Sequence, residues 1–240
     1  NRATPHARVN GKIQIVQPFD IDNVAPAGGI HSSAEEMAKW IKVLLNQGSL
    51  DDGTQLISRE TVRELWTLVT PIPIGTHPPS LTAMQSNFLG YALGFAVRDY
   101  RGHKMVSHTG GLPGFLSQVT MLPKQKLGIV VLTNQESGYA FRSITHWILD
   151  HYLNTSDTDW LAAFKESERN AQIRREQTEE KIKTTRVESS KPSLPLREYA
   201  DSYTDPWYGN IQISLTKQNR LQLEFSHTEM LKGELEHWQH

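Results

Sequence analysis

The chain has 240 residues, of which 38% are hydrophobic and 21% are charged, and it contains no cysteine. This composition supports one large domain, or one domain with a small module, and excludes a disordered chain, a disulfide framework and a cysteine nucleophile. A formal net charge of -1 gives no general attraction for nucleic acid, so we expect no nucleic-acid partner. We also expect no membrane span in this chain, because no apolar run approaches the roughly 20 residues that cross a bilayer.

The N-terminal segment is predicted to be a loop followed by a helix. Residues 1–25 show little periodicity, and a glycine-rich turn is expected over residues 26–30. Ser33, with Glu36 three residues later, has the pattern of a helix N-cap. Apolar residues then recur at helical spacing, and Gly48 is placed to end this helix in the left-handed conformation.

A second helix is predicted to begin at Ser58. Its apolar stripe has helical spacing, and Pro71 is expected to stop it. The proline-rich segment from Pro71 to Ser80 must be a loop, and its length is typical of a functional rim or of disorder. The stripe consists of Val62, Leu65, Trp66 and Val69.

Four short strands and a closing helix are predicted next. Turn residues separate the strands, and connections this short require antiparallel neighbours. Gly110 and Gly111, with the Pro-Gly turn after them, are expected to end the second strand. A helix over roughly Tyr139–Leu153 completes an α/β layered domain, an antiparallel sheet flanked by helices. The four strands are expected at residues 89–97, 105–109, 116–122 and 127–133.

Three regions are expected along the chain. Residues 1–156 form the helix-and-sheet domain, residues 157–195 a charged helix and linker, and residues 196–240 a small β module. Apolar residues alternate over 211–215 and 221–225, which predicts a β-hairpin. Because two strands make a thin sheet, truncation of this module is one expectation.

The segment that carries chemistry is His108-Thr109-Gly110-Gly111. Glycines at a sheet edge let a substrate lie close to the backbone and leave an N–H free to point at a ligand. Such an N–H can be half of an oxyanion hole, and His108 can supply a hydrogen bond or a positive charge beside it. The alternative is a glycine hairpin with an incidental histidine, and these four residues do not decide between the two.

Four segments in chain order resemble serine hydrolases of the β-lactamase and penicillin-binding-protein superfamily. They resemble the class C-type form, whose third motif reads His-Thr-Gly-Gly where many members have Lys-Thr-Gly. The resemblance covers roughly residues 24–153 and implies a β-lactamase/transpeptidase-like fold, incomplete here. The segments are Pro26-Ala27-Gly28-Gly29-Ile30 with the helix start after it, Gly90-Tyr91-Ala92-Leu93-Gly94-Phe95, His108-Thr109-Gly110-Gly111-Leu112-Pro113-Gly114-Phe115, and Val130-Val131-Leu132-Thr133-Asn134.

The resemblance implies acyl transfer, in which a serine attacks an amide, ester or β-lactam carbonyl and water then releases the acyl group. It implies that the Gly111 N–H is one oxyanion-hole donor and that His108 assists proton transfer or binds a substrate carboxylate. Thr109 would line the cleft, and Gly110 would contact the substrate. The expected partner is a small-molecule or peptide acyl substrate, with no cofactor and no metal, in a periplasmic or extracellular location.

The family nucleophile is missing from this sequence. In the family it lies in Ser-x-x-Lys at a helix start, upstream of all four segments, and a Tyr-x-Asn motif is upstream too. Here a Ser-x-x-Lys pattern occurs at Ser214–Lys217 and a Tyr-x-Asn pattern at Tyr208–Asn210, both in the predicted β module. Ser and Lys three residues apart share a face only on a helix, so we expect neither match to be catalytic.

We therefore expect a fragment of a serine acyl hydrolase, inactive alone and dependent on the missing N-terminal part of the same domain. The alternative is a non-catalytic pseudo-enzyme or a peptide- or glycan-binding module. Four aromatic residues of the tail can line a groove for such a ligand, although packing in the core of a small sheet is favoured. They are Tyr203, Trp207, Tyr208 and Trp238.

Overall fold

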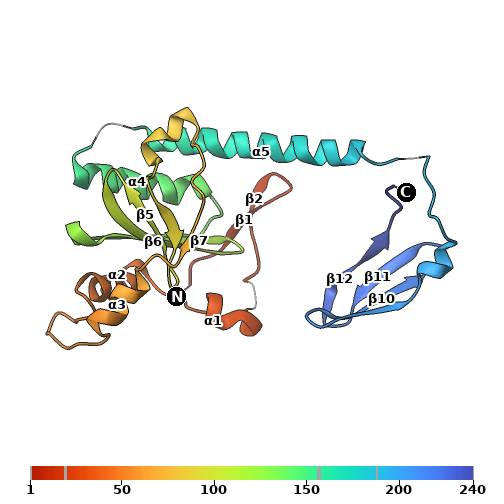
Figure 1. Ribbon diagram of the computed structural model, residues 1–240, viewed down its shortest axis with the longest axis horizontal. Coiled ribbons are helices and arrows are strands. Elements are labelled where there is room, and N and C mark those ends of the chain that lie inside the picture. The colour runs from red at the N-terminus through yellow and green to blue at the C-terminus, as the bar shows by residue number, and fades with distance from the viewer. Residues whose placement is uncertain (1, 19–20, 156–157, 188, 240) are drawn as a thin grey trace. The chain divides into compact units, whose positions relative to one another are not determined.

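The computed structural model describes residues 2–18, 21–155, 158–187 and 189–239. It divides into two compact units, Asn1–Ala171 and Gln172–His240. The division falls inside the charged helix α5 (Trp160–Thr184), within the region where the sequence predicts a charged helix and linker. Figure 1 shows the helices and strands of each unit.

The first unit is built on a six-stranded antiparallel sheet with the order β3-β4-β5-β6-β7-β8. Each strand pairs with the next one along the chain, as the short connections predict. The antiparallel sheet expected from the sequence is therefore confirmed. Its strands are β3 (Thr70–Pro71), β4 (Leu89–Tyr91), β5 (Ala96–Tyr100), β6 (His103–Leu112), β7 (Phe115–Leu122) and β8 (Leu127–Thr133).

Helices cover both faces of this sheet (Figure 1). On one face α2 (Ala34–Leu45) and α3 (Arg59–Leu65) bury a cluster that includes Val106. On the other face α4 (Gly138–Leu153) and the start of α5 bury a cluster that includes Met105. Neighbouring residues of β6 thus enter different cores, because side chains alternate across a strand.

Both predicted helix starts are confirmed. The side chain of Ser33 accepts a hydrogen bond from the Glu36 N–H, and that of Ser58 accepts one from the Thr61 N–H. The predicted end of the second helix is wrong, because α3 stops at Leu65. The chain then extends, and the segment containing Pro71 pairs with β4.

The N-terminal loop prediction is also wrong. The segment contains a β-hairpin of β1 (His6–Val9) and β2 (Lys12–Ile15), then a short 3₁₀ segment, Asp22–Val24, and the helix α1 (Ala25–Gly28) in place of the expected turn. Asn10 and Gly11 connect β1 and β2 with φ values of 49° and 78°. An Asn-Gly pair favours such a turn, and this local signal outweighs the weak alternation of the strands.

The strands before the His-Thr-Gly-Gly segment differ from the prediction in two ways. The strand expected over residues 89–97 is interrupted after Tyr91 by a turn that contains Gly94, with φ of 86°. Glycine permits this left-handed conformation, and β5 begins only after it. In addition, β6 does not end at its glycines but continues through them to Leu112, with β7 as its partner.

The second unit contains a four-stranded antiparallel sheet with the order β12-β11-β10-β9. The predicted hairpin is confirmed, with Ile213 opposite Leu223, and β9 and β12 extend it on its two sides. Packing of all the tail aromatics in a core is wrong, since Trp207 is 88% exposed. The elements are a 3₁₀ segment, Leu196–Tyr199, then β9 (Ser202–Asp205), β10 (Gly209–Leu215), β11 (Leu221–Phe225) and β12 (Thr228–Leu235).

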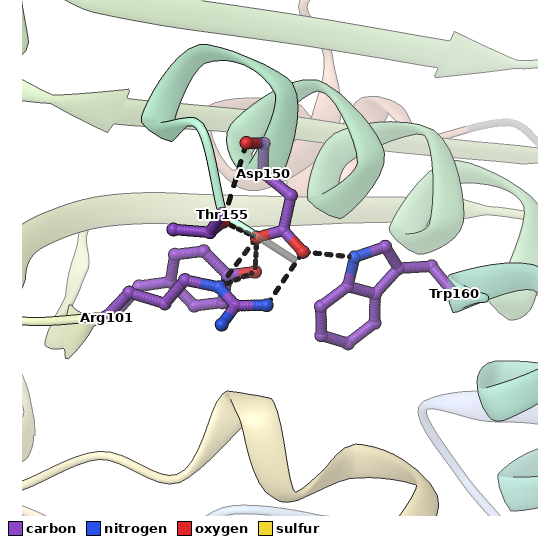
Figure 2. Close-up of polar contacts among 5 residues, drawn as sticks. Arg101, Asp150, Thr155 and Trp160 are labelled. Carbon is purple, nitrogen blue, oxygen red and sulfur yellow. Dashed lines mark hydrogen bonds and ion pairs between the residues drawn. The ribbon is translucent and has the colours of Figure 1, made fainter. Parts of the chain in front are cut away.

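Asp150, near the end of α4, ties together the sheet and both helices of its face (Figure 2). Its carboxylate accepts two hydrogen bonds from the Arg101 guanidinium, at 2.7 and 2.8 Å, and one from the Trp160 indole at 2.9 Å. The Tyr100 and Thr155 hydroxyls donate to it as well. Burial opposes ionisation, but these donors hold the pKa of Asp150 below its ordinary value.

We predict that Asp150→Asn lowers the free energy of unfolding by about 3–5 kcal/mol, because the substitution leaves the Arg101 charge without its buried partner. Urea denaturation of the chain measures the loss. Asp51→Asn is the matched control, because it breaks an exposed ion pair with Lys42, and we expect it to cost at most about 1 kcal/mol. Equal losses for the two variants would contradict this role of Asp150.

His146, on α4, is buried among aromatic rings and is held in the neutral form. Its Nδ1 donates to the Arg142 carbonyl, and its ring contacts Trp160 and Phe164. In the part of the chain that the structure describes, its Nε2 has no hydrogen-bond partner. Burial lowers the pKa of His146 from 6.5 to about 4.

This shift predicts a loss of stability in mild acid. The folded pKa lies below the unfolded one, so the unfolded chain binds the proton more readily, and stability falls as the pH drops through the range from 6.5 to about 4. Between about pH 7 and pH 5 the loss should be about 2 kcal/mol, measured by urea denaturation. His146→Phe should flatten this slope, while His151→Gln, at an exposed position of the same helix, should preserve it.

Candidate active site

The segment His108–Leu112 forms an open edge inside the sheet. The pairing of β5 with β6 runs from Tyr100–His103 only as far as Ala96–Ser107. Beyond that point β6 continues with β7 alone. The interruption of the predicted strand at the Gly94 turn is therefore what exposes one side of the His-Thr-Gly-Gly backbone.

The register decides which backbone groups face this edge. The pairs Tyr100–His103 and Leu112–Phe115 close the turns at the two ends of β6, and both turns have two residues. A closing pair of this kind exchanges both backbone hydrogen bonds, and the direction then alternates along the strand. The N–H and C=O groups of Thr109 and Gly111 thus point away from β7, toward the open side.

The side chains of His108 and Thr109 are exposed and lie on opposite faces of the sheet. His108 Nε2 lies 3.0 Å from the Tyr91 hydroxyl, and the two rings meet edge-on at 6.2 Å. A Cβ placed on Gly110 would lie only 2.4 Å from the Ser117 hydroxyl oxygen, whereas one placed on Gly111 would meet its nearest atom at 3.4 Å. The two glycines therefore differ, because a side chain at Gly110 would clash with the neighbouring strand β7 and one at Gly111 would not.

Segments far apart in the sequence hold the tip of the β6–β7 hairpin. The Gly114 carbonyl accepts a hydrogen bond from the His6 N–H, and the Gly114 N–H donates to the Glu136 carboxylate at 2.7 Å. The helix α1 also reaches this tip, since a Cβ on Gly28 would lie 3.6 Å from the Leu112 side chain. Two of the four family-like segments, the first and the third, thus meet at this end of β6 together with His6 and Glu136.

A hollow of the first unit lies away from this edge. Its volume is about 1040 Å³, and it is bounded by α4 and the start of α5, with no residue of β6 in its lining. The open edge, rather than this hollow, brings together the residues that the sequence singles out. We therefore place the candidate active site at the edge.

The structure also locates the Ser-x-x-Lys pattern of the tail. Ser214 lies in β10, where it pairs with Gln222, and Lys217 lies in the turn that follows. They occupy no helix and belong to the second unit, as expected from the sequence. In the described ranges, no group of three or more His, Cys, Asp or Glu side chains is arranged to hold a metal ion. Within the same ranges, no helix is long and apolar enough to cross a membrane.

An antiparallel sheet with helices on both faces and a glycine-rich strand edge is the arrangement expected for a β-lactamase or penicillin-binding-protein fold. The family model for beta-lactamase matches residues 1–152, so this chain belongs to the β-lactamase family. A second model, a domain of unknown function (DUF3471), matches residues 185–240. The predicted family and fold class are thereby confirmed.

Relatives with curated names include hydrolases. The chain is 25% identical to Unguisins hydrolase ungD' of Aspergillus campestris, over 88% of this chain and 39% of that protein. It is 27% identical to Unguisins hydrolase ungD of Aspergillus violaceofuscus, over 82% and 36%, and 26% identical to Protein flp of Staphylococcus aureus, over 59% and 25%. The chain spans less than half the length of these relatives.

A solved structure has the same fold. The octameric penicillin-binding protein homologue from Pyrococcus abyssi matches 97% of this chain with a TM-score of 0.51 and 17% sequence identity. The match covers 43% of that protein, so here too the chain corresponds to part of a longer polypeptide.

Substitution of Gly114 tests whether the N-terminal segment packs on the tip of the β6–β7 hairpin. The φ of Gly114 is 82°, and a Cβ there would meet Pro5 and the His6 nitrogen at 2.4 and 2.8 Å. We predict that Gly114→Ala lowers stability by about 2–3 kcal/mol in urea denaturation, since strain and a clash with backbone combine. The control Gly102→Ala has nearly the same φ, 78°, but open space, and should cost about 1 kcal/mol. Equal costs would mean that the N-terminal segment does not pack on the tip.

Proposed function

We propose that this chain forms one wall of the active site of a serine acyl hydrolase that acts on an amide, ester or β-lactam through an acyl-enzyme. The observation that carries the proposal is the open edge of β6, where the register turns the backbone of Thr109 and Gly111 away from β7. The family match and the hydrolase names of two relatives support it.

In this proposal the acyl part of the substrate lies along the edge as an additional strand. Its backbone-like groups pair with the free N–H and C=O groups of Thr109 and Gly111. Gly110 keeps this stretch of strand without a side chain, so the substrate can approach closely. The substrate is thereby oriented before any bond changes.

Acylation then proceeds by attack of a serine hydroxyl on the carbonyl carbon. The carbonyl oxygen becomes an oxyanion, to which the Gly111 N–H donates one hydrogen bond. The oxyanion then collapses, the bond to the leaving group breaks, and the leaving group takes up the proton that the serine has given up. His108 assists this proton transfer or binds a substrate carboxylate. Water subsequently attacks the acyl-serine and releases the acid, which restores the serine hydroxyl.

The serine itself would come from the N-terminal part of the same domain, outside this chain. In the described residues, the sole Ser-x-x-Lys pattern lies on a strand and turn of the other unit. We therefore expect this chain to be inactive alone and the full-length gene product to be active.

The experiment treats this chain and the full-length gene product with a fluorophosphonate probe and a labelled penicillin. We predict a covalent adduct on the full-length protein and none on this chain. If the full-length protein neither labels nor hydrolyses simple esters, the proposed function is wrong.

Substitution of Gly111 tests the oxyanion role. In the full-length protein, Gly111→Val should cut the acylation rate about 100-fold, because a bulky side chain displaces the reacting carbonyl. Gly233→Val is the control, because Gly233 lies on a strand of the other unit with open space around it. An unchanged rate for Gly111→Val would remove this residue from the site.

A second candidate function is ligand binding without catalysis. The observation that favours it is the exposure of Trp207, at 88%, and of Met230, at 93%, on the small β unit. Exposed aromatic and thioether groups are typical of surfaces that bind peptides or glycans. Peptide or glycan binding by this chain that is lost in Trp207→Ala, with no adduct on the full-length protein, would favour this function.

A further inference from the structure

The contact between Tyr91 and His108 bridges two strands that are not neighbours. β4 carries Tyr91 and β6 carries His108, with β5 between them. Tyr91 pairs with Ala96, and Ala96 pairs with Ser107, so Tyr91 lies level with the residue that precedes His108. Because β5 begins at Ala96, the tyrosine ring can pass its end and reach the imidazole.

Packing does not account for Tyr91. Its side chain is 39% exposed, whereas Tyr100, on the next strand, is fully buried and bonded to Asp150. Among the described residues, the 3.0 Å hydrogen bond and the edge-on ring contact of the Tyr91 side chain are both with His108. The tyrosine thus acts on the one ionisable side chain of the His-Thr-Gly-Gly segment.

A phenol is a good hydrogen-bond donor, and a neutral imidazole has one donor and one acceptor nitrogen. When the Tyr91 hydroxyl donates to Nε2, the imidazole proton must reside on Nδ1. When the imidazole is protonated, Nε2–H donates to the tyrosine oxygen instead, and Nδ1 still carries a proton. In both states Nδ1–H remains available as a donor.

We propose that Tyr91 is a positioning residue that fixes the tautomer and orientation of His108, so that Nδ1–H is presented to the acyl substrate. The substrate group it fits is an oxygen acceptor, a carbonyl or a carboxylate. This inference rests on the proposed function, because His108 needs a substrate to act on. Its structural part, the tautomer, can be tested without any activity.

The first test uses this chain with ¹⁵N-labelled histidine. Long-range ¹H–¹⁵N correlation spectra at about pH 9, where a free imidazole is neutral, report which ring nitrogen is protonated, and His108→Gln identifies the signal. We expect the Nδ1–H form for His108, and a shift to the Nε2–H form in Tyr91→Phe. The same tautomer in both proteins would overturn the inference.

Tyr152→Phe is the matched control for this test. Tyr152 is also exposed and meets a histidine, His151, edge-on at 5.9 Å. Removing its hydroxyl should leave the His108 signal unchanged. A His108 shift as large as that in Tyr91→Phe would mean that the signal reports a general change in fold, and would overturn the inference.

The second test is a double-mutant cycle on the hydrolytic rate of the full-length protein. Tyr91→Phe should lower kcat about tenfold, the effect of one hydrogen bond, with KM changed less. In a His108→Gln background the same substitution should have no further effect, because Tyr91 acts through His108. Losses that simply multiply would assign Tyr91 a merely structural role.

The failure of the proposed function and the failure of this inference can be distinguished. If the full-length protein has no acyl-hydrolase activity, the proposed function fails while the tautomer measurement still decides whether Tyr91 controls His108. If activity is present and His108 has the same tautomer with and without the Tyr91 hydroxyl, the proposed function stands and this inference fails.

Discussion

The pairing of β6 is the constraint on which the candidate site depends. This strand is fixed by a two-residue turn at each end, so the direction of every N–H along it is determined. β5 accompanies it for only half of its length, because the Gly94 turn interrupts the preceding strand. β6 is therefore an interior strand of the sheet, but one of its sides is unpaired at Gly110 and Gly111.

The rest of the first unit holds this strand in place. Met105 and Val106 anchor the paired half of β6 in two different cores, one under α4 and one under α2 and α3. Asp150 binds α4 to the turn between β5 and β6 through Arg101. The open half of the strand has no such core of its own, and its tip is held instead by hydrogen bonds from residues distant in the sequence. The rest of the unit thus fixes the position of β6, while one side of its glycine segment is unpaired with β5.

The sequence predictions were correct for features that depend on residues close together in the chain, and they missed contacts between residues far apart. The caps at Ser33 and Ser58 and the strand Leu127–Thr133 were predictable, because each depends on residues within a few positions. The same local logic applied to Asn10-Gly11 would have found the N-terminal hairpin. The contacts of Tyr91 with His108 and of His6 with Gly114 join residues that lie far apart in the chain, and no local pattern signals them.

The sequence by itself determined the family, the helix starts at Ser33 and Ser58, the antiparallel pairing of the central strands, and the residue types of the candidate site. These follow from motif, periodicity and local hydrogen bonding. Only the tertiary structure decided that β6 runs through its glycines, that β5 ends early beside them, and that Tyr91 reaches His108. These features arise from strand register and from packing between distant segments. Such contacts form only when the rest of the folded chain brings the two distant segments together.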